Sequence, residues 1–397
     1  MELKNIILQH AAELQEEVKD IRRYLHKNPE LSFQEKGTSE YIRSILDSWG
    51  IEYKYPYVET GILAILNGKE EGKVVALRTD MDALPITEQN QTNYASMNPG
   101  VMHACGHDVH MATLLGALKI LSSLRDQFSG KVLFIFQPGE EKAPGGAKLM
   151  MEEGLFKDIQ PDIILGQHVM PDMNSGVVGF KPGMYMASSN EIFITVKGKG
   201  GHAALPKNII DPILISSHIL ISLQEEIREH TPKDIPTILA FGKVIADGAM
   251  NVIPNHVRIE GTFRTMNEKW RYEAHELIRK TVENISTSMG GSADIEIVPG
   301  YPVLYNDPDV TKQSREFAAE LLGEENIIDM DIRMTAEDFA WFSQSYPSMM
   351  YRLGVKSPSD DKVYPLHTST FQVDEIALKT GTTMMSWLTM KFLTTEQ

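Results

Sequence analysis

Cysteine is almost absent from this chain: its 397 residues include one, Cys105. A single cysteine excludes a disulfide framework within the chain and leaves three interpretations of the thiol, namely a buried apolar residue, a redox group or a metal ligand. The thiol lies in the run Met102-His103-Ala104-Cys105-Gly106-His107-Asp108-Val109-His110. Because thiolate and imidazole groups two residues apart suit a borderline-soft divalent ion such as zinc, the run favours a metal ligand.

Long apolar runs are missing as well. No stretch reaches the ~18 apolar residues that a membrane-spanning helix needs. Residues 1–25 lack the basic start and the uninterrupted apolar core of a signal peptide, and their spacing predicts an amphipathic helix. Together with the single cysteine, these absences predict a cytoplasmic protein.

Basic residues are few: 38 lysines and arginines stand against 54 aspartates and glutamates, a net charge of -16. This balance argues against nucleic acids and anionic membrane surfaces as partners. It also disfavours highly anionic substrates, unless a local basic pocket binds them. The hydrophobic content of 42% is ordinary for a globular protein with a substantial core.

The first half of the chain alternates helical and strand patterns. Helices are expected at 8–27, 38–49 and 109–125. Short continuous apolar runs, typical of strands buried on both faces, occur at 61–66, 74–77, 132–136 and 162–165. Strands that alternate with helices predict an α/β fold with a mixed, largely parallel sheet flanked by helices on both sides.

Polar clusters follow three of these strands. They are Asp80 with Asp82, Gln137 to Glu141, and Gln167 with His168. Open α/β sheets bind ligands beyond the carboxyl ends of their strands, so these side chains are expected to converge. The run at 103–110 is expected to join them, because it precedes a helical pattern at 111–124 that Asp108 could cap.

The pattern changes after residue 183. Strands are expected at 190–197, 236–246, 255–265 and 292–298, and helices at 210–230 and 268–288. The order β-α-β-β-α-β is that of the ferredoxin-like motif, so 184–295 is predicted to be an inserted α+β domain between two parts of the first domain, 1–183 and 296–397. The resumed domain is expected to contain a helix at 309–323, a strand at 349–353, a loop with His367 and a C-terminal helix from about 373, with Asp374 and Glu375 in its first turn.

Each candidate taken alone also has an ordinary structural explanation. Glu140 and Glu141 could be adjacent acids on a solvated loop, His168 and His367 could be structural, and Asp82 could be a turn residue. Convergence favours function, because the parallel architecture would gather a thiol, imidazoles and carboxylates at one edge.

The motifs resemble those of the M20 metallopeptidase family, specifically its amidohydrolase branch of N-acyl-amino-acid, hippurate and auxin-conjugate hydrolases. The resemblance runs nearly end to end. It is carried by Arg23 to Ser32, Asp80-Met81-Asp82-Ala83-Leu84-Pro85, His103 to Asp108, Gln137-Pro138-Gly139-Glu140-Glu141, Gly200-Gly201-His202-Ala203-Ala204 and Asn251-Val252-Ile253-Pro254. Several motifs in one order are specific, whereas no single one would be.

The resemblance implies two divalent ions. The matching ligand positions are Cys105, His107, Glu141, His168 and His367, with Cys105 bridging the ions. Zinc suits this donor set, and manganese, cobalt and nickel are alternatives. Asp82 matches an aspartate that orients a ligand. Asp80 stands where other branches have a ligand histidine, so it is not counted as a ligand.

The resemblance also implies amide hydrolysis, with Glu140 as the proton-transferring base. His202 is implied to stabilise the tetrahedral intermediate from the partner subunit, which predicts a homodimer through 184–295. Asn251 and Arg264 match positions that bind the substrate's carboxylate.

The leading hypothesis is therefore a cytoplasmic dimetal hydrolase that cleaves N-acyl amino acids to a carboxylic acid and a free amino acid. A dipeptidase or carboxypeptidase with the same metals is one alternative. A non-catalytic metal-binding protein on the same fold is another, against which the presence of Glu140 argues.

Overall fold

The computed structural model describes residues 2–395, which divide into two compact units. Unit 1 comprises the chain up to Gly183, Tyr305–Asp331 and the chain from Asp338 onward. Unit 2 comprises Met184–Leu304 and Ile332–Glu337. Short strands β7 (Gly183–Met186) and β14 (Leu304–Asn306) span the residues at which the chain passes from one unit to the other.

Unit 1 is built on a sheet that has eight strands within the described residues, in the order β1-β2-β4-β3-β5-β16-β6-β15. The strands are β1 (Glu52–Tyr57), β2 (Gly61–Asn67), β3 (Val74–Asp80), β4 (Lys131–Gln137), β5 (Ile163–Asn174), β6 (Val178–Phe180), β15 (Ile327–Asp329) and β16 (Ser348–Lys356). The central neighbours β4, β3, β5 and β16 are parallel, while β1, β2 and β6 introduce antiparallel pairs. The predicted mixed, largely parallel sheet is therefore confirmed.

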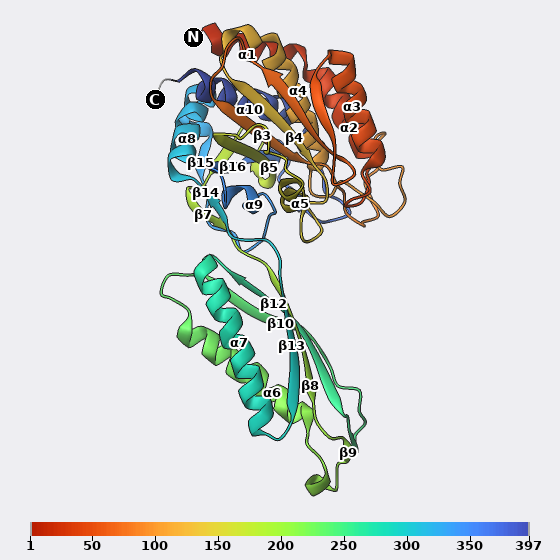
Figure 1. Cartoon of the computed structure of the whole chain (residues 1–397). Helices are drawn as coiled ribbons and strands as arrows, with labels where there is room; N and C mark the ends of the chain where they lie inside the picture. The colour runs from red at the N-terminus through yellow and green to blue at the C-terminus, as the bar shows by residue number, and fades with distance from the viewer. Residues whose placement is uncertain (1, 396–397) are drawn as a thin grey trace. The chain divides into compact units, whose positions relative to one another are not determined.

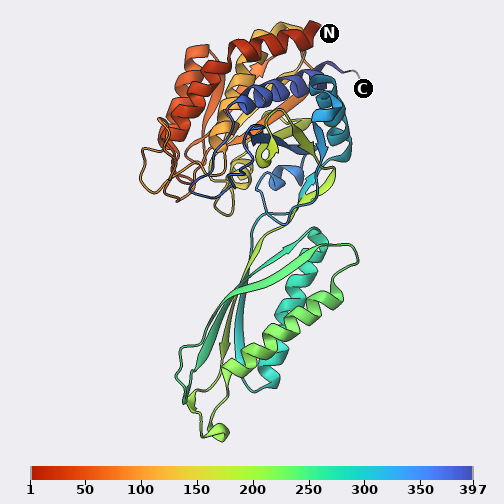
Figure 2. The ribbon, with the colours of Figure 1, turned by 180° about the vertical axis from the view of Figure 1, so that it is seen from behind.

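Helices cover both faces of this sheet (Figure 1). They are α1 (Glu2–Glu13), α2 (Gln15–Lys27), α3 (Lys36–Trp49), α4 (His107–Ser123), α5 (Gly146–Glu152), α8 (Pro308–Leu322), α9 (Ala340–Ser343) and α10 (Ile376–Thr394), with 3₁₀ turns at Arg125–Gln127 and Glu324–Asn326. Helices α4 and α10 are apolar on nearly every side and pack against each other and β3, and α1 lies along α10 (Figure 2). Gly116 permits this close packing, since an added Cβ would lie 2.8 Å from atoms of both Thr382 and Val18.

Several helix boundaries in unit 1 differ from prediction by one or two residues, and two helices differ more clearly. The single helix expected at 8–27 is divided at Leu14 into α1 and α2, although the bonds from Leu14 N–H to His10 and from Val18 N–H to Leu14 continue the helical ladder. The C-terminal helix begins at Ile376, not near 373. Asp374 lies ahead of it, because its N–H donates to the Val355 carbonyl and its carboxylate accepts the N–H of Ile376.

Unit 2 has its own antiparallel sheet in the order β10-β12-β8-β13, covered by two helices that share its core. Its elements are β8 (Asn190–Lys197), β9 (Gly201–His202), a 3₁₀ turn (Pro206–Asn208), α6 (Pro212–His230), β10 (Thr237–Ile245), β11 (Val252–Ile253), β12 (His256–Thr265), α7 (Glu268–Ser288) and β13 (Ser292–Pro299). The main elements follow the predicted order β-α-β-β-α-β. Side chains cap both helices, Asp211 at α6 and Asn267 at α7.

The predicted end of the inserted segment, residue 295, falls inside β13. That strand continues its pairing with β8 up to Pro299 opposite Asn190, so the compact unit extends to Leu304. The later segment Ile332–Glu337 also returns to unit 2, where Arg333 pairs with Met186. This pairing joins residues far apart in the sequence, so the periodicity of apolar residues could not predict it.

Within residues 2–395, no helix combines the length and the apolar character needed to cross a lipid bilayer.

Candidate metal centre

The candidate ligands lie on segments at the carboxyl ends of the central strands. Cys105 precedes α4 and His107 is the first residue of that helix, with Gly106 between them at φ 84°. An added Cβ at Gly106 would collide with Val169, so glycine allows the close approach of the two segments. Glu141 follows β4.

His367 comes from the loop between β16 and α10 and has a left-handed backbone at φ 59°. Its N–H donates to the carbonyl of Ala104 at 2.8 Å, which ties this loop to the segment of Cys105. Non-glycine residues in this sparsely populated conformation occur often at functional sites.

His168 departs from the prediction that it follows its strand. It lies within β5, where Gln167 pairs with Tyr351 and His168 with Arg352 of β16. The polar residues did not end the strand, because β16 continues to supply backbone hydrogen bonds beyond the apolar run. His168 is 5% exposed and its ring faces the other candidates.

The structure brings all five predicted ligands together. Cys105 Sγ lies 3.5 Å from His168 Nε2 and 3.3 Å from His367 Nε2, which is itself 3.2 Å from Glu141 Oε1. His107 Nε2 lies 4.0 Å from both Glu141 Oε1 and Glu140 Oε2. Two groups of potential ligand atoms share the thiol: Cys105 with His107 and His168, and Cys105 with Glu141 and His367. A sulfur common to both groups suits a bridging ligand.

The histidine rings are oriented to present lone pairs to this cluster. His107 Nδ1 donates to the Asp82 carbonyl and His168 Nδ1 donates to the Val169 carbonyl, each at 2.8 Å. The proton is thereby assigned to Nδ1, which leaves Nε2 available as a ligand. Within the described residues, buried His107 Nε2 and Glu141 Oε1 make no hydrogen bond. Orphaned ligand atoms that face one another fit a bound cation.

The charges of the cluster fit a cation as well. Burial raises the pKa of the Cys105 thiol well above its usual range, and the Glu141 and Glu140 carboxylates raise it further. Burial alone would lower the pKa of His107, but Asp80 and Asp82 outweigh it and raise that pKa to about 10, so a cation bound at Nε2 would replace a proton there. A divalent ion would offset this concentration of negative charge and favour the thiolate.

Asp82 holds the loop that follows β4. Its Oδ1 accepts the N–H of Glu140 at 3.0 Å, and its Oδ2 accepts the N–H of Glu141 at 2.9 Å and the hydroxyl of Ser32 at 2.6 Å. Burial would raise the pKa of Asp82, but these bonds and His107, 3.4 Å away, lower it. Asp82 therefore contacts both the ligand His107 and the backbone that carries Glu140 and Glu141.

A buried network beneath the cluster was missed by sequence reasoning. Asp80 accepts from His110 Nδ1 and from Arg78 Nη1, each at 2.7 Å, and Arg78 Nη2 donates to Asp338 at 2.7 Å. Asp80 is thus engaged on both oxygens, although it also lies 3.8 Å from His107 Nε2. The available signal was a charged pair, Arg78 and Asp80, at the end of strand β3, which begins with four apolar residues.

Asp108 does not cap α4. It lies in the first turn, and its Oδ2 accepts from Arg22 Nε at 2.7 Å and from His26 Nδ1 at 2.8 Å. The carboxylate therefore links α4 to α2, which lies 80 residues and more away in sequence.

Three predicted site residues belong to unit 2 and are described within it. His202 and Asn251 are exposed and lie on neighbouring segments, with Ala203 N–H donating to the Asn251 carbonyl at 3.0 Å. Arg264 on β12 is partly buried, which lowers its pKa, and its Nη1 donates to the Met334 carbonyl at 3.1 Å.

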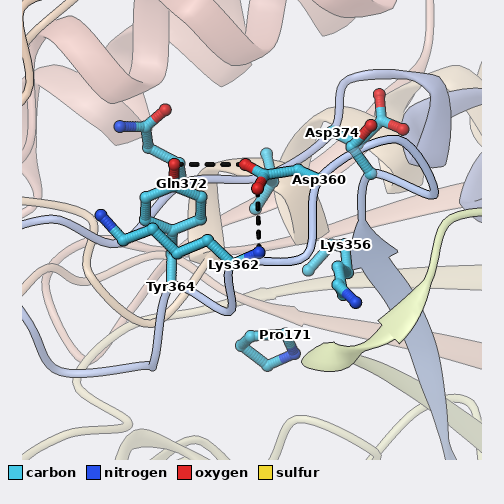
Figure 3. A pocket seen from close by; sticks show the side chains of 10 residues that line it. Pro171, Lys356, Asp360, Lys362, Tyr364, Gln372 and Asp374 are labelled. Carbon is cyan, nitrogen blue, oxygen red and sulfur yellow. Dashed lines mark hydrogen bonds between the residues drawn. The ribbon is translucent and has the colours of Figure 1, made fainter.

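A separate small pocket, of about 120 Å³, opens beside β16 and the loop that precedes α10 (Figure 3). Lys356, Lys362 and Asp374 line it, together with Asp360, which accepts the Lys362 N–H at 2.8 Å and the Tyr364 hydroxyl at 3.3 Å. None of the five metal-ligand candidates is among its lining residues, so it is distinct from the metal centre.

Known proteins share this arrangement of sequence and fold. The family model for peptidase family M20/M25/M40 matches residues 76–389. N-acetylcysteine deacetylase of Bacillus subtilis is 37% identical over 360 residues, covering 90% of this chain and 92% of that protein. Thermostable carboxypeptidase 2 of Saccharolobus solfataricus is 34% identical over 395 residues, covering 99% of each.

The crystal structure of the Bacillus subtilis YxeP protein, a dinuclear metal-binding peptidase of the M20 family, has a TM-score of 0.83 to this fold. It is 33% identical, and the match covers 97% of this chain and 100% of that one. A family match over most of the chain, with relatives above 30% identity along nearly its whole length, leads to one conclusion. This protein is a member of peptidase family M20/M25/M40.

Proposed function

We propose that this protein is a metal-dependent amidohydrolase that cleaves the linear amide bond of N-acyl amino acids, releasing a carboxylic acid and a free amino acid. One observation carries the proposal: the Glu140 carboxylate, 6% exposed as a residue, lies beside a cluster of one thiol, three imidazoles and one carboxylate. The similarity to an N-acetylcysteine deacetylase supports this substrate class.

Two divalent ions are proposed as cofactors, held by the five candidate ligands with Cys105 between them. Zinc suits a site of thiolate, imidazole and carboxylate donors, while manganese, cobalt and nickel are the alternatives. When bound, such ions activate water and polarise the acyl carbonyl.

Glu140 is proposed to carry the proton. Its carboxylate removes a proton from the attacking water, whose oxygen bonds to the acyl carbon, and delivers that proton to the departing nitrogen as the C–N bond breaks. Asp82 contributes by holding the Glu140 backbone N–H at 3.0 Å, so that the base keeps its place during the transfer.

Unit 2 is proposed to bind the amino-acid end of the substrate. A guanidinium such as that of Arg264 pairs with a carboxylate through two parallel hydrogen bonds, and Asn251 adds an amide donor. His202 is proposed to donate to the developing oxyanion in the partner's active site of a homodimer. Exposed Ile213, Leu214 and Ile221 on α6 support a surface for self-association. The molar mass of the protein in solution tests the proposed dimer. A monomeric mass at micromolar protein concentration would exclude it.

The activity is tested with metal-loaded protein on N-acetyl amino acids, hippurate and dipeptides side by side. Hydrolysis of the acyl amino acids, lost in Glu140→Gln at unchanged metal content, is the expected result. Absence of hydrolysis across the panel by fully loaded protein would instead support the non-catalytic alternative.

A carboxypeptidase activity is the second candidate, favoured by the thermostable carboxypeptidase that matches 99% of this chain. Faster cleavage of unblocked peptides than of acyl amino acids would establish it. The cytoplasmic location proposed from the single cysteine and the missing long apolar runs is a separate prediction, tested by fractionating the cells that produce the protein.

A further inference from the structure

We infer that Glu35 is a positioning residue for Glu140. It acts by holding the backbone of Gly139, so that the loop after β4 presents its two consecutive carboxylates to the metal centre. The inference rests on the proposed function, because it assigns a purpose to the placement of the proposed base.

Glu35 immediately precedes α3 and is fully buried. Its Oε1 accepts the N–H of Gly139 at 2.8 Å and the N–H of Phe33 at 2.8 Å. Its Oε2 accepts the hydroxyl of Thr60 at 2.9 Å. The carboxylate thus joins the start of α3, the start of β2 and the loop after β4.

Two buried carboxylates therefore hold three consecutive amides. Glu35 accepts from Gly139, and Asp82 accepts from Glu140 at 3.0 Å and from Glu141 at 2.9 Å. Each of these three amides is fixed by a hydrogen bond to a buried carboxyl group, and the two bonds to the Asp82 carboxylate are charge-assisted, which makes them stronger than neutral ones. Such an arrangement restricts the rotation of the whole segment.

Phe33 and Gly139, which both donate a backbone N–H to Glu35, both have left-handed backbone conformations. Phe33 has φ 64°, a left-handed backbone conformation that is an outlier for an aromatic residue. Its ring lies directly over Gly139, which has φ 61°, and an added Cβ on Gly139 would overlap the ring. Phe33 covers the glycine from one side while Glu35 holds its N–H.

Glu35 is poorly suited to a purely structural role. Burial, and then repulsion by Asp82, raise its pKa to about 7, and within the described residues no basic side chain forms an ion pair with it. An ionisable group buried without a cation costs stability, and such costs concentrate at functional sites. We assign that function to the hydrogen bond from the Gly139 N–H, which holds the loop after β4.

The test compares Glu35→Ala and Glu35→Gln with the wild-type enzyme on an N-acetyl amino acid. Glu35→Ala is expected to lower kcat about 10- to 100-fold with KM within about twofold, because a displaced base misaligns proton transfer without weakening binding. Glu35→Gln should recover most of the rate, since its carbonyl oxygen still accepts from Gly139. Metal content should equal that of the wild type in both variants.

Glu30→Ala is the matched control. Glu30 also accepts two backbone amides at the start of α3, those of Gly37 at 3.0 Å and Thr38 at 2.8 Å, but the loop after β4 is not among its partners. It should lose stability while kcat stays unchanged. Equal losses of kcat in Glu30→Ala and Glu35→Ala would overturn the inference, as would an unchanged kcat in folded Glu35→Ala.

If Glu35→Ala does not fold, Glu35→Asp gives the answer, because its shorter side chain keeps the carboxyl group but withdraws it from the Gly139 N–H. The same loss of kcat with retained KM and metal supports the inference, and a wild-type rate contradicts it. A wild-type enzyme that is inactive on the whole substrate panel refutes the proposed function instead, a different and recognisable outcome.

Discussion

The carboxylate of Asp82 accepts a hydrogen bond at 3.0 Å from the backbone N–H of Glu140. The carbonyl of the same aspartate accepts from His107 Nδ1 at 2.8 Å. One residue thereby sets the position of the proposed base and the orientation of a proposed ligand. The two groups therefore share one support.

Glu140→Gln is expected to lower kcat about 10²- to 10⁴-fold, the usual contribution of a positioned general base. The amide side chain keeps the size of the carboxylate but cannot take a proton. Steady-state kinetics on an N-acetyl amino acid measures the loss, and elemental analysis provides the control. A loss of rate that accompanies a loss of metal would identify Glu140 as a ligand instead.

Cys105→Ala is expected to remove most bound metal, because the thiol belongs to both groups of ligand atoms. Elemental analysis after gel filtration measures the stoichiometry, and a value that stays near two would contradict the bridging role. Since Cys105 is the chain's one cysteine, a thiol reagent reports on it alone.

Arg264→Ala is expected to raise KM more than it lowers kcat, since it removes a contact to the unreactive end of the substrate. Kinetics on N-acyl amino acids of one acyl group provides the measurement. Arg264→Lys serves as the partner variant, and it should recover only part of the binding because an ammonium cannot form the two-pronged contact. A loss confined to kcat would argue against this role.

Glu35→Gln is expected to change how stability depends on pH. The pKa of Glu35 is raised from 4.5 to about 7 in the folded protein. The folded state therefore binds this proton more tightly than the unfolded state, so its contribution is complete below pH 4.5 and is lost as the pH rises toward 7.

The wild type should consequently lose up to about 3 kcal/mol relative to Glu35→Gln between pH 4.5 and pH 7.5. Urea denaturation of both metal-free proteins across this range measures the difference. Parallel stability curves would show that Glu35 does not titrate there.

Much of the secondary structure followed from local pattern. The expected strand 190–197 and helix 268–288 coincide with β8 and α7, because alternation and helical periodicity were uninterrupted there. Boundaries failed where long-range contacts decided them. His168 stayed inside β5 because β16 pairs with it, and Asp108 turned to Arg22 instead of capping α4.

The sequence alone determined which chemical groups were available and on which segments they lay. One thiol in a histidine-rich run, two acids after an apolar strand and two distant histidines indicated a metal centre, and their motifs indicated the family. The roles of individual residues stay predictions. Only the tertiary structure decided how the groups are held. Asp82 and Glu35 accept hydrogen bonds from three consecutive backbone amides. Asp80 accepts hydrogen bonds from Arg78 and His110. Such contacts join residues separated by tens to hundreds of positions, and no local periodicity encodes which buried carboxylate meets which backbone amide.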